Sequence, residues 1–224
     1  MTDPIPSTIR EIRKQLRLAM NGVVSTSMRE KGATYKLNFG VSLPKIKEIA
    51  ATFAPDPELA EALWQEDVRE LKILATLLQP IDRFDREQAV RWASMVGQSE
   101  IAECYTTFLL QKLPYARELA MQWIGSSEEL MQLQGFLLAA RVCQQGQILT
   151  PQEAEHLIGE AKTVMDAGVS RTQRAALLAL KHYGRQSQSM ASAVLSALAD
   201  YPASGSPEKQ EFYEDLKFEF DYYQ

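Results

Sequence analysis

Long apolar runs are absent from this chain of 224 residues. No stretch approaches the roughly 20 apolar residues that a membrane-spanning helix needs, and the N-terminal segment lacks the apolar core of a signal peptide. We therefore expect no membrane partner and a cytoplasmic location. Strand signals are nearly absent as well, which excludes a β-rich fold.

Cysteine and histidine are scarce, with two of each in the chain. Cys104 and Cys143 lie far apart in apolar helical stretches, so we interpret them as buried thiols rather than as a disulfide. No CxxC pair is present and the histidines stand apart, so the spacing of a zinc site is missing. His156 and Glu160 share a helix face, but an exposed acidic face explains them better. We expect neither a metal nor a cofactor.

Known catalytic sequence motifs and a net positive charge are also lacking. The chain contains no phosphate-binding loop, no GxGxxG, no GxSxG elbow, no HExxH and no nucleobase-deaminase pattern. The net charge is −5 and the sequence pI is about 5.2. A net acidic protein attracts phosphate weakly as a whole, although a local basic face can still bind it.

Helical periodicity dominates what remains. Expected helices cover about 7–21, 24–31, 43–53, 57–64, 67–78, 83–96, 99–113, 114–124, 126–143, 150–165, 169–183 and 187–199, with a loop and then a helix over 204–224. Short loops favour antiparallel neighbours, and a period of roughly 35–45 residues is typical of HEAT-like repeats. We predict an all-α, right-handed superhelix of antiparallel helix pairs forming a single domain over residues 1–224, with a compact bundle as the alternative.

Local signals mark several of these helices. Ser7 or Thr8 is a candidate cap of the first helix, and Ser42, followed by Pro44 in the first turn, is expected to cap the third. Trp64, Trp92 and Trp123 stand among apolar neighbours near helix ends. We interpret all three indoles as packing residues rather than as platforms for base stacking.

Two basic stripes are candidate anion-binding surfaces. Arg10, Lys14 and Arg17 follow one side of the first helix, where a solvated face is the simpler interpretation. The second stripe, here called the basic stripe, lies on a late helix with Leu178 in its gap and consists of Arg171, Arg174, Lys181 and Arg185. Like charges along one helix face repel each other unless anions or acidic side chains lie opposite. The stripe therefore favours either phosphate binding or internal salt bridges.

Glu100 and Glu103 stand one turn apart on a helix that is otherwise apolar. Two acids on one turn usually mark a solvated edge. If Glu103 were buried, its pKa would be raised and it could serve as a base.

Several segments together resemble the AlkD-type DNA alkylation repair family of HEAT-like proteins. The resemblance covers about residues 20–190 and leaves a helical C-terminal extension over about 204–224. The similar stretches are residues 39–50 (FGVSLPKIKEIA), 62–64 (ALW), 70–78 (ELKILATLL), 115–123 (YARELAMQW), 135–140 (GFLLAA) and 174–185. The resemblance implies a curved array of HEAT-like helix pairs. It also implies a relation to enzymes that excise alkylated purines from duplex DNA by hydrolysing the N-glycosidic bond.

The residues that the family uses for excision are only partly present. Active members place a Trp and an Asp four residues apart on one helix and a second Trp on a late helix. By the resemblance, the first Trp falls on Ser99, the Asp on Glu103 and the second Trp on Leu178. Both indole faces, which would stabilise an oxocarbenium-like transition state, are thus replaced. Glu103 keeps the negative charge with a longer reach.

Three hypotheses follow. The first is a DNA-binding protein of this family, with base excision lost or reduced, that holds duplex or irregular DNA through the basic stripe. The second is an active alkylpurine DNA glycosylase in which Glu103 is the catalytic carboxylate. The third is a scaffold for a protein partner, which suits the acidic pI and the usual role of helical repeats.

Overall fold

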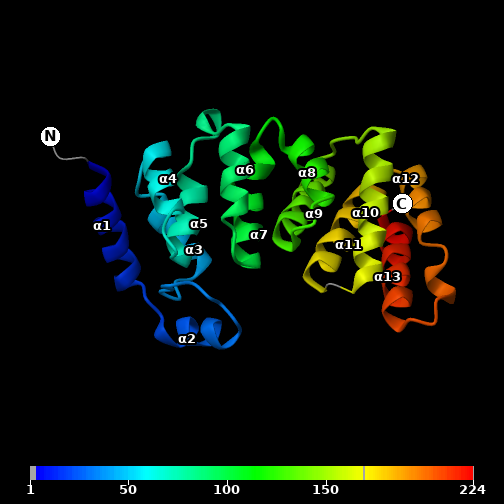
Figure 1. Ribbon diagram of the computed structural model, residues 1–224, viewed down its shortest axis with the longest axis horizontal. Helices are drawn as coiled ribbons and strands as arrows, with labels where there is room; N and C mark the ends of the chain where they lie inside the picture. The colour runs from blue at the N-terminus through cyan, green and yellow to red at the C-terminus, as the bar shows by residue number, and fades with distance from the viewer. Residues whose placement is uncertain (1–3, 169, 224) are drawn as a thin grey trace. The chain divides into compact units, whose positions relative to one another are not determined.

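Thirteen α-helices account for most of the residues that the structure, a computed structural model, describes, namely 4–168 and 170–223 (Figure 1). They are α1 (Pro4–Leu18), α2 (Gly22–Glu30), α3 (Leu43–Ala50), α4 (Pro57–Trp64), α5 (Arg69–Leu78), α6 (Arg86–Ser94), α7 (Ser99–Phe108), α8 (Ala116–Ile124), α9 (Glu129–Gln144), α10 (Pro151–Ala167), α11 (Ser170–Gly184), α12 (Gln188–Ala197) and α13 (Pro207–Tyr223). Three short 3₁₀ turns lie between them, and no strand occurs within the described ranges. The all-α prediction is confirmed.

The chain divides into two compact units, Met1–Lys112 and Leu113–Gln224. In the first unit α4 packs against α5, and α5 lies between α3 and α7. In the second unit α8 packs against α9 and α10 against α11, and α11 also contacts α9, α12 and α13. Each unit is thus built from neighbouring helix pairs. The prediction of a single domain over residues 1–224 stays a prediction.

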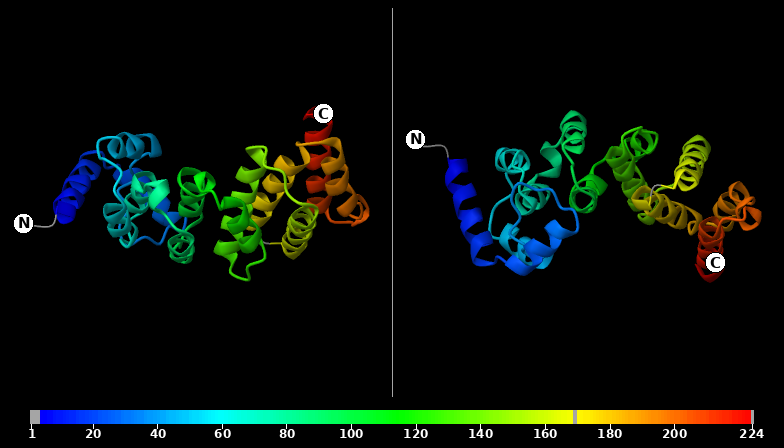
Figure 2. Two further views of the ribbon diagram at one scale, coloured as in Figure 1. Left: turned by 90° about the horizontal axis from the view of Figure 1, so that it is seen from above. Right: turned by 60° about the horizontal axis from the view of Figure 1, so that its bottom comes forward.

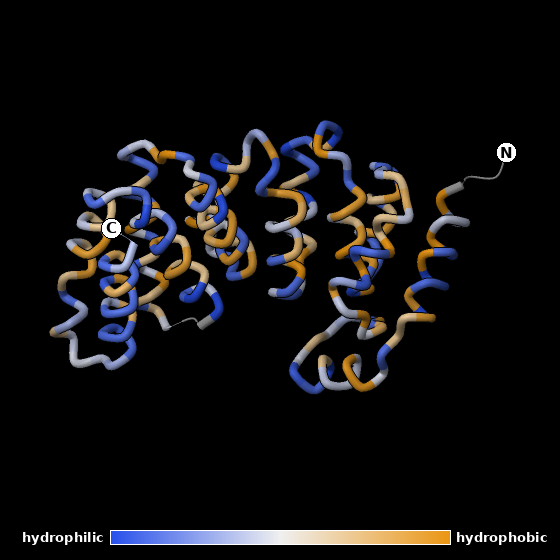
Figure 3. Tube along the Cα trace, turned by 180° about the vertical axis from the view of Figure 1, so that it is seen from behind, coloured by the Kyte–Doolittle hydropathy of each residue, from blue (hydrophilic) through white to orange (hydrophobic). Residues whose placement is uncertain are grey.

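Amphipathic helices create the core of each unit, and in Figure 3 hydrophobic and hydrophilic residues alternate along the helices. Ile12 and Leu16 of α1 are fully buried, as the predicted apolar stripe requires, whereas Met20 lies beyond the helix end and is 59% exposed. Burial of such side chains contributes about 1.5–3 kcal/mol each.

Helix starts follow local chemistry more closely than helix ends do. Thr150 and Glu153 form a capping box at the start of α10. The capping prediction for the first helix was wrong, because α1 begins at Pro4, before Ser7 and Thr8. Ser42 is the N-cap residue of α3, as predicted, but its side chain makes no capping hydrogen bond. Since Pro44 occupies the first turn of α3, one of the backbone donors that a cap would satisfy is already missing.

A buried carboxylate fastens the segment that precedes α3. Glu70 of α5 accepts hydrogen bonds from the backbone N–H groups of Phe39 (3.1 Å) and Val41 (3.2 Å). Gly40 between them has φ +68°, and a Cβ there would stand 2.3 Å from the carbonyl oxygen of Asn21. Glycine is therefore required at this position, and the segment is held to α5 by its backbone.

Candidate nucleic-acid interface

The basic stripe follows one side of α11 in the second unit. Arg171 and Arg174 are exposed, and Leu178 between the two halves of the stripe is 38% exposed. The opposite side of the same helix, with Ala176, Ala179 and Leu180, is buried in the core. The 3.6-residue period thus places the four basic residues on one side, as predicted.

Helix α13 lies alongside α11 (Figure 2). Its carboxylates pair with the later half of the stripe, Lys181 and Arg185. Lys181 Nζ is 2.7 Å from Asp215 Oδ2 and 3.9 Å from Glu219 Oε2. The Arg185 guanidinium also pairs with Glu219, and its Cζ lies 4.0 Å from the centroid of the Tyr223 ring. Internal salt bridges therefore occupy two of the four predicted DNA-binding residues.

Arg174, in the earlier half of the stripe, faces the beginning of α13 across a hollow of about 310 Å³. Arg174 lines this hollow together with Glu208, Glu211 and Asp215. We call Glu208, Glu211, Asp215 and Glu219 the acidic face of α13. The spacing of 3, 4 and 4 residues keeps these carboxylates on one side of the helix.

A fifth cation joins this surface from α9. The pKa of His182 is lowered because burial disfavours its charged form, and because Arg185, Arg141 and Lys181 place positive charge nearby. Arg141 is not among the DNA-binding residues predicted from the sequence. Its position in the last turn of α9 was the available signal.

Apolar contacts hold α13 in place. Leu216 and Phe220 are 0% and 2% exposed, and the Phe220 ring lies against Gly184 at the end of α11. A Cβ on Gly184 would stand 2.3 Å from two atoms of that ring. Helix α13 thus docks on α11 through the Phe220 ring, which fits only because residue 184 is glycine.

The start of α13 is fixed by an ion pair. Lys209 Nζ lies 2.6 Å from Asp166 Oδ1, which also accepts a hydrogen bond from the Tyr201 hydroxyl (2.9 Å). These two donors, Lys209 foremost, lower the pKa of Asp166. The acidic face is consequently held beside the basic stripe at both ends of α13.

In the first unit, Glu103 stands on the surface of α7 and is exposed. Neighbouring side chains remove part of its water and so raise its pKa, and the Glu100 carboxylate adds to that effect. Glu100 itself is held by Arg69, whose Nε and Nη2 atoms donate to its two oxygens at 2.7 and 2.6 Å. Glu100 is therefore engaged in structure, while Glu103 reaches solvent. Ser99 is half-buried at the start of α7.

All three tryptophans of the chain are buried. Trp64 and Trp92 are 0% exposed and stack with ring centroids 4.5 Å apart, and Trp123 is 3% exposed. Trp92 Nε1 donates a hydrogen bond to Glu61 (2.7 Å). Packing is confirmed as their role, so no indole of this protein presents a face to a base or a sugar.

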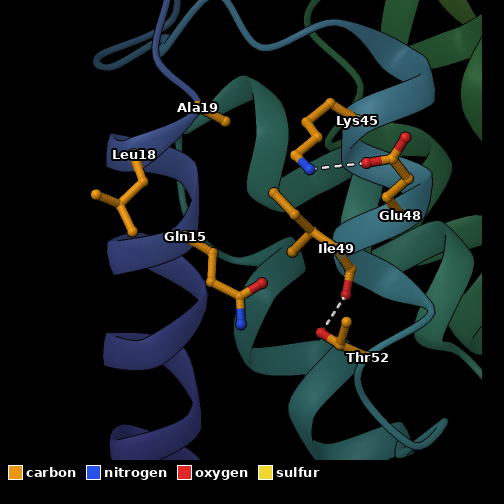
Figure 4. A pocket seen from close by; sticks show the side chains of 7 residues that line it. All are labelled: Gln15, Leu18, Ala19, Lys45, Glu48, Ile49 and Thr52. Atoms are coloured by element: carbon orange, nitrogen blue, oxygen red, sulfur yellow. Dashed lines mark hydrogen bonds and ion pairs between the residues drawn. The ribbon is translucent and has the colours of Figure 1, made fainter.

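The remaining hollows and polar groups offer little chemistry. A mostly apolar hollow of about 540 Å³ lies between α1 and α3, where Lys45 is paired with Glu48 at 2.7 Å (Figure 4). His156 Nε2 lies 3.1 Å from the carbonyl oxygen of Met121. Across 4–168 and 170–223, no cluster of His, Cys, Asp and Glu could hold a metal ion. The same ranges contain no helix long and apolar enough to cross a membrane.

The helix pairs and the row formed by α9, α11 and α13 define a HEAT-like helical-repeat protein. The chain belongs to the DNA alkylation repair family, since the family described as DNA alkylation repair enzyme matches residues 12–207. In fold it is similar to a solved member of a new family of proteins related to the HEAT-like repeat DNA glycosylases with affinity for branched DNA structures. That match has a TM-score of 0.76 and 16% identity, and covers 95% of this chain and 94% of that one. No curated protein sequence matches the chain.

Proposed function

We propose that this protein binds DNA through backbone phosphates and has lost most or all base excision. The observation that carries the proposal is the basic stripe on α11, set on one side of a helix in a member of the DNA alkylation repair family. Arginine and lysine in such a row neutralise successive phosphates without reading sequence. The affinity of the structural relative for branched DNA favours duplex arms or junctions as the ligand.

The buried indoles support the loss of excision. An electron-rich ring beside a cationic base or sugar contributes about 0.5–2 kcal/mol, and two such rings are replaced here by Ser99 and Leu178. Glu103 carries its carboxylate on a longer side chain than aspartate would. A displacement of about 1 Å at a reacting centre can cost about 100-fold in rate.

Binding to labelled DNA tests the proposal. The anisotropy of a fluorescein-labelled duplex and of a four-way junction would be measured over a range of salt concentrations. A variant carrying glutamine at all four stripe positions, Arg171, Arg174, Lys181 and Arg185, is expected to bind far more weakly than the parent and to show a shallower dependence on salt.

A matched control removes the same charge from the first unit. Glutamine at Arg29, Lys31, Lys36 and Arg83, all exposed and outside both basic stripes, alters net charge equally. We expect this control to keep most of the affinity. If the stripe variant bound both DNAs as well as the parent did, the proposal would be abandoned.

A glycosylase that uses Glu103 is the second candidate, favoured by the exposure and raised pKa of that carboxyl. Its assay is release of 3-methyladenine or 7-methylguanine from an alkylated duplex. We expect release no faster than without protein. Release by the parent that is lost in Glu103→Gln would establish excision instead.

A further inference from the structure

We propose that α13 is a built-in competitor for nucleic-acid phosphate, whose carboxylates stand where DNA phosphates would lie on α11. The inference rests on the proposed DNA binding and adds that the carboxylates of α13 lower the affinity for DNA. Its basis is the set of ion pairs that Lys181 and Arg185 make with Asp215 and Glu219.

The two sets of charges match in order along their helices. Lys181 and Arg185 are four residues apart, as are Asp215 and Glu219, and each pairs with its counterpart in sequence. A row of carboxylates spaced by one helical turn, about 6 Å along the axis, presents negative charge at regular intervals, as a nucleic-acid strand does. The acidic face therefore offers the stripe the same kind of partner that DNA would.

The competition does not require α13 to leave. Leu216 and Phe220 fix the helix backbone, whereas Asp215 is 41% exposed and Glu219 14% exposed at the side chain. A phosphate approaching from solvent can displace the Asp215 carboxylate by rotation of one side chain. Glu219 is enclosed more deeply and is held by two cations. DNA can thus open the short pair of Lys181 with Asp215, whereas the pairs that Lys181 and Arg185 make with Glu219 are more enclosed.

Neutralising the two carboxylates tests the inference. The variant Asp215→Asn/Glu219→Gln keeps side-chain shape and leaves both cations available for phosphate. Two additional phosphate contacts steepen the logarithmic salt slope by about 1.8, so that binding falls about 12-fold more than in the parent between about 50 and 200 mM salt. At the lower salt concentration the variant binds the labelled duplex and four-way junction more tightly than the parent.

The control is Glu155→Gln/Glu214→Gln, which removes the same negative charge from exposed positions on α10 and α13. A general charge effect would raise the affinity of both variants equally, whereas competition raises that of Asp215→Asn/Glu219→Gln and steepens its slope. Adding Lys181→Ala and Arg185→Ala to that variant should abolish the gain. Far-UV circular dichroism would establish that helix content is unchanged. If the helix content of the double variant were reduced, the single variant Asp215→Asn would replace it, with an expected change in the salt slope of about 0.9.

The outcomes separate the two proposals. Suppose that the parent binds DNA and that the four-residue stripe variant does not. If Asp215→Asn/Glu219→Gln then gains no more affinity than the control Glu155→Gln/Glu214→Gln, competition by α13 is refuted and DNA binding stands. If parent and variants all leave both DNA probes unbound at low salt, both proposals fail.

Discussion

Gly184→Ala is a test in which two physical effects have opposite signs. Placing alanine in a helix instead of glycine stabilises by about 0.5–1 kcal/mol, since less backbone entropy is lost on folding. At this position, however, the new methyl group would overlap the Phe220 ring, whose atoms lie 2.3 Å from the added Cβ.

The steric effect should win. If the ring of Phe220 is forced out of its site, much of the burial energy of a large apolar side chain is lost, about 1.5–3 kcal/mol. Subtracting the helix gain leaves a net destabilisation of about 0.5–2.5 kcal/mol. For a protein of this length, each kcal/mol lowers Tm by about 2–4 °C.

Urea denaturation followed by far-UV circular dichroism measures the difference. Gly159→Ala is the matched control because Gly159 lies inside α10 with no atom within 4 Å of the added Cβ. That variant is expected to be stabilised by about 0.5–1 kcal/mol. If Gly184→Ala were stabilised to the same degree, the docking of α13 through Phe220 would be wrong.

Two further predictions concern buried polar groups. Glu70→Gln should lower the free energy of unfolding by about 3 kcal/mol, since it turns an amide toward backbone donors and removes a charge beside Arg69; the surface variant Glu48→Gln, measured in the same urea titration, should change it by less than about 1 kcal/mol. The lowered pKa of His182 means that the unfolded chain binds more protons than the folded one as pH falls below about 6.5. Stability should therefore decline from pH 7.5 to 5.5 more in the parent than in His182→Gln, and equal declines would contradict the assignment.

Much of the fold could be predicted from local signals. The range 57–64 matches α4, and the Thr150-Pro151 pair marks the start of α10, because proline and capping side chains act within one turn. Helix ends were less certain. The helix expected over 43–53 ends at Ala50, and the Thr52 hydroxyl donates a hydrogen bond to the carbonyl oxygen of Ile49 in its last turn (2.7 Å).

Of the candidate site, only the basic residues of α11 could be predicted from the sequence, and not the carboxylates that pair with them. The spacing on α11 places its four basic residues together, but their partners come from a helix more than thirty positions later in the chain. A matching signal was present, since the carboxylates of α13 recur every three or four residues. Recognising the match requires knowing that α11 and α13 are neighbours, and only tertiary packing supplies that.

The enclosed tryptophans have a practical consequence for spectroscopy. Trp64 and Trp92 report on the first unit and Trp123 on the second, each from a position that solvent barely reaches. Nucleic acid cannot stack on these fluorophores or quench them by direct contact. A change in intrinsic emission when DNA is added would therefore signal rearrangement inside a unit, and not merely the arrival of a ligand.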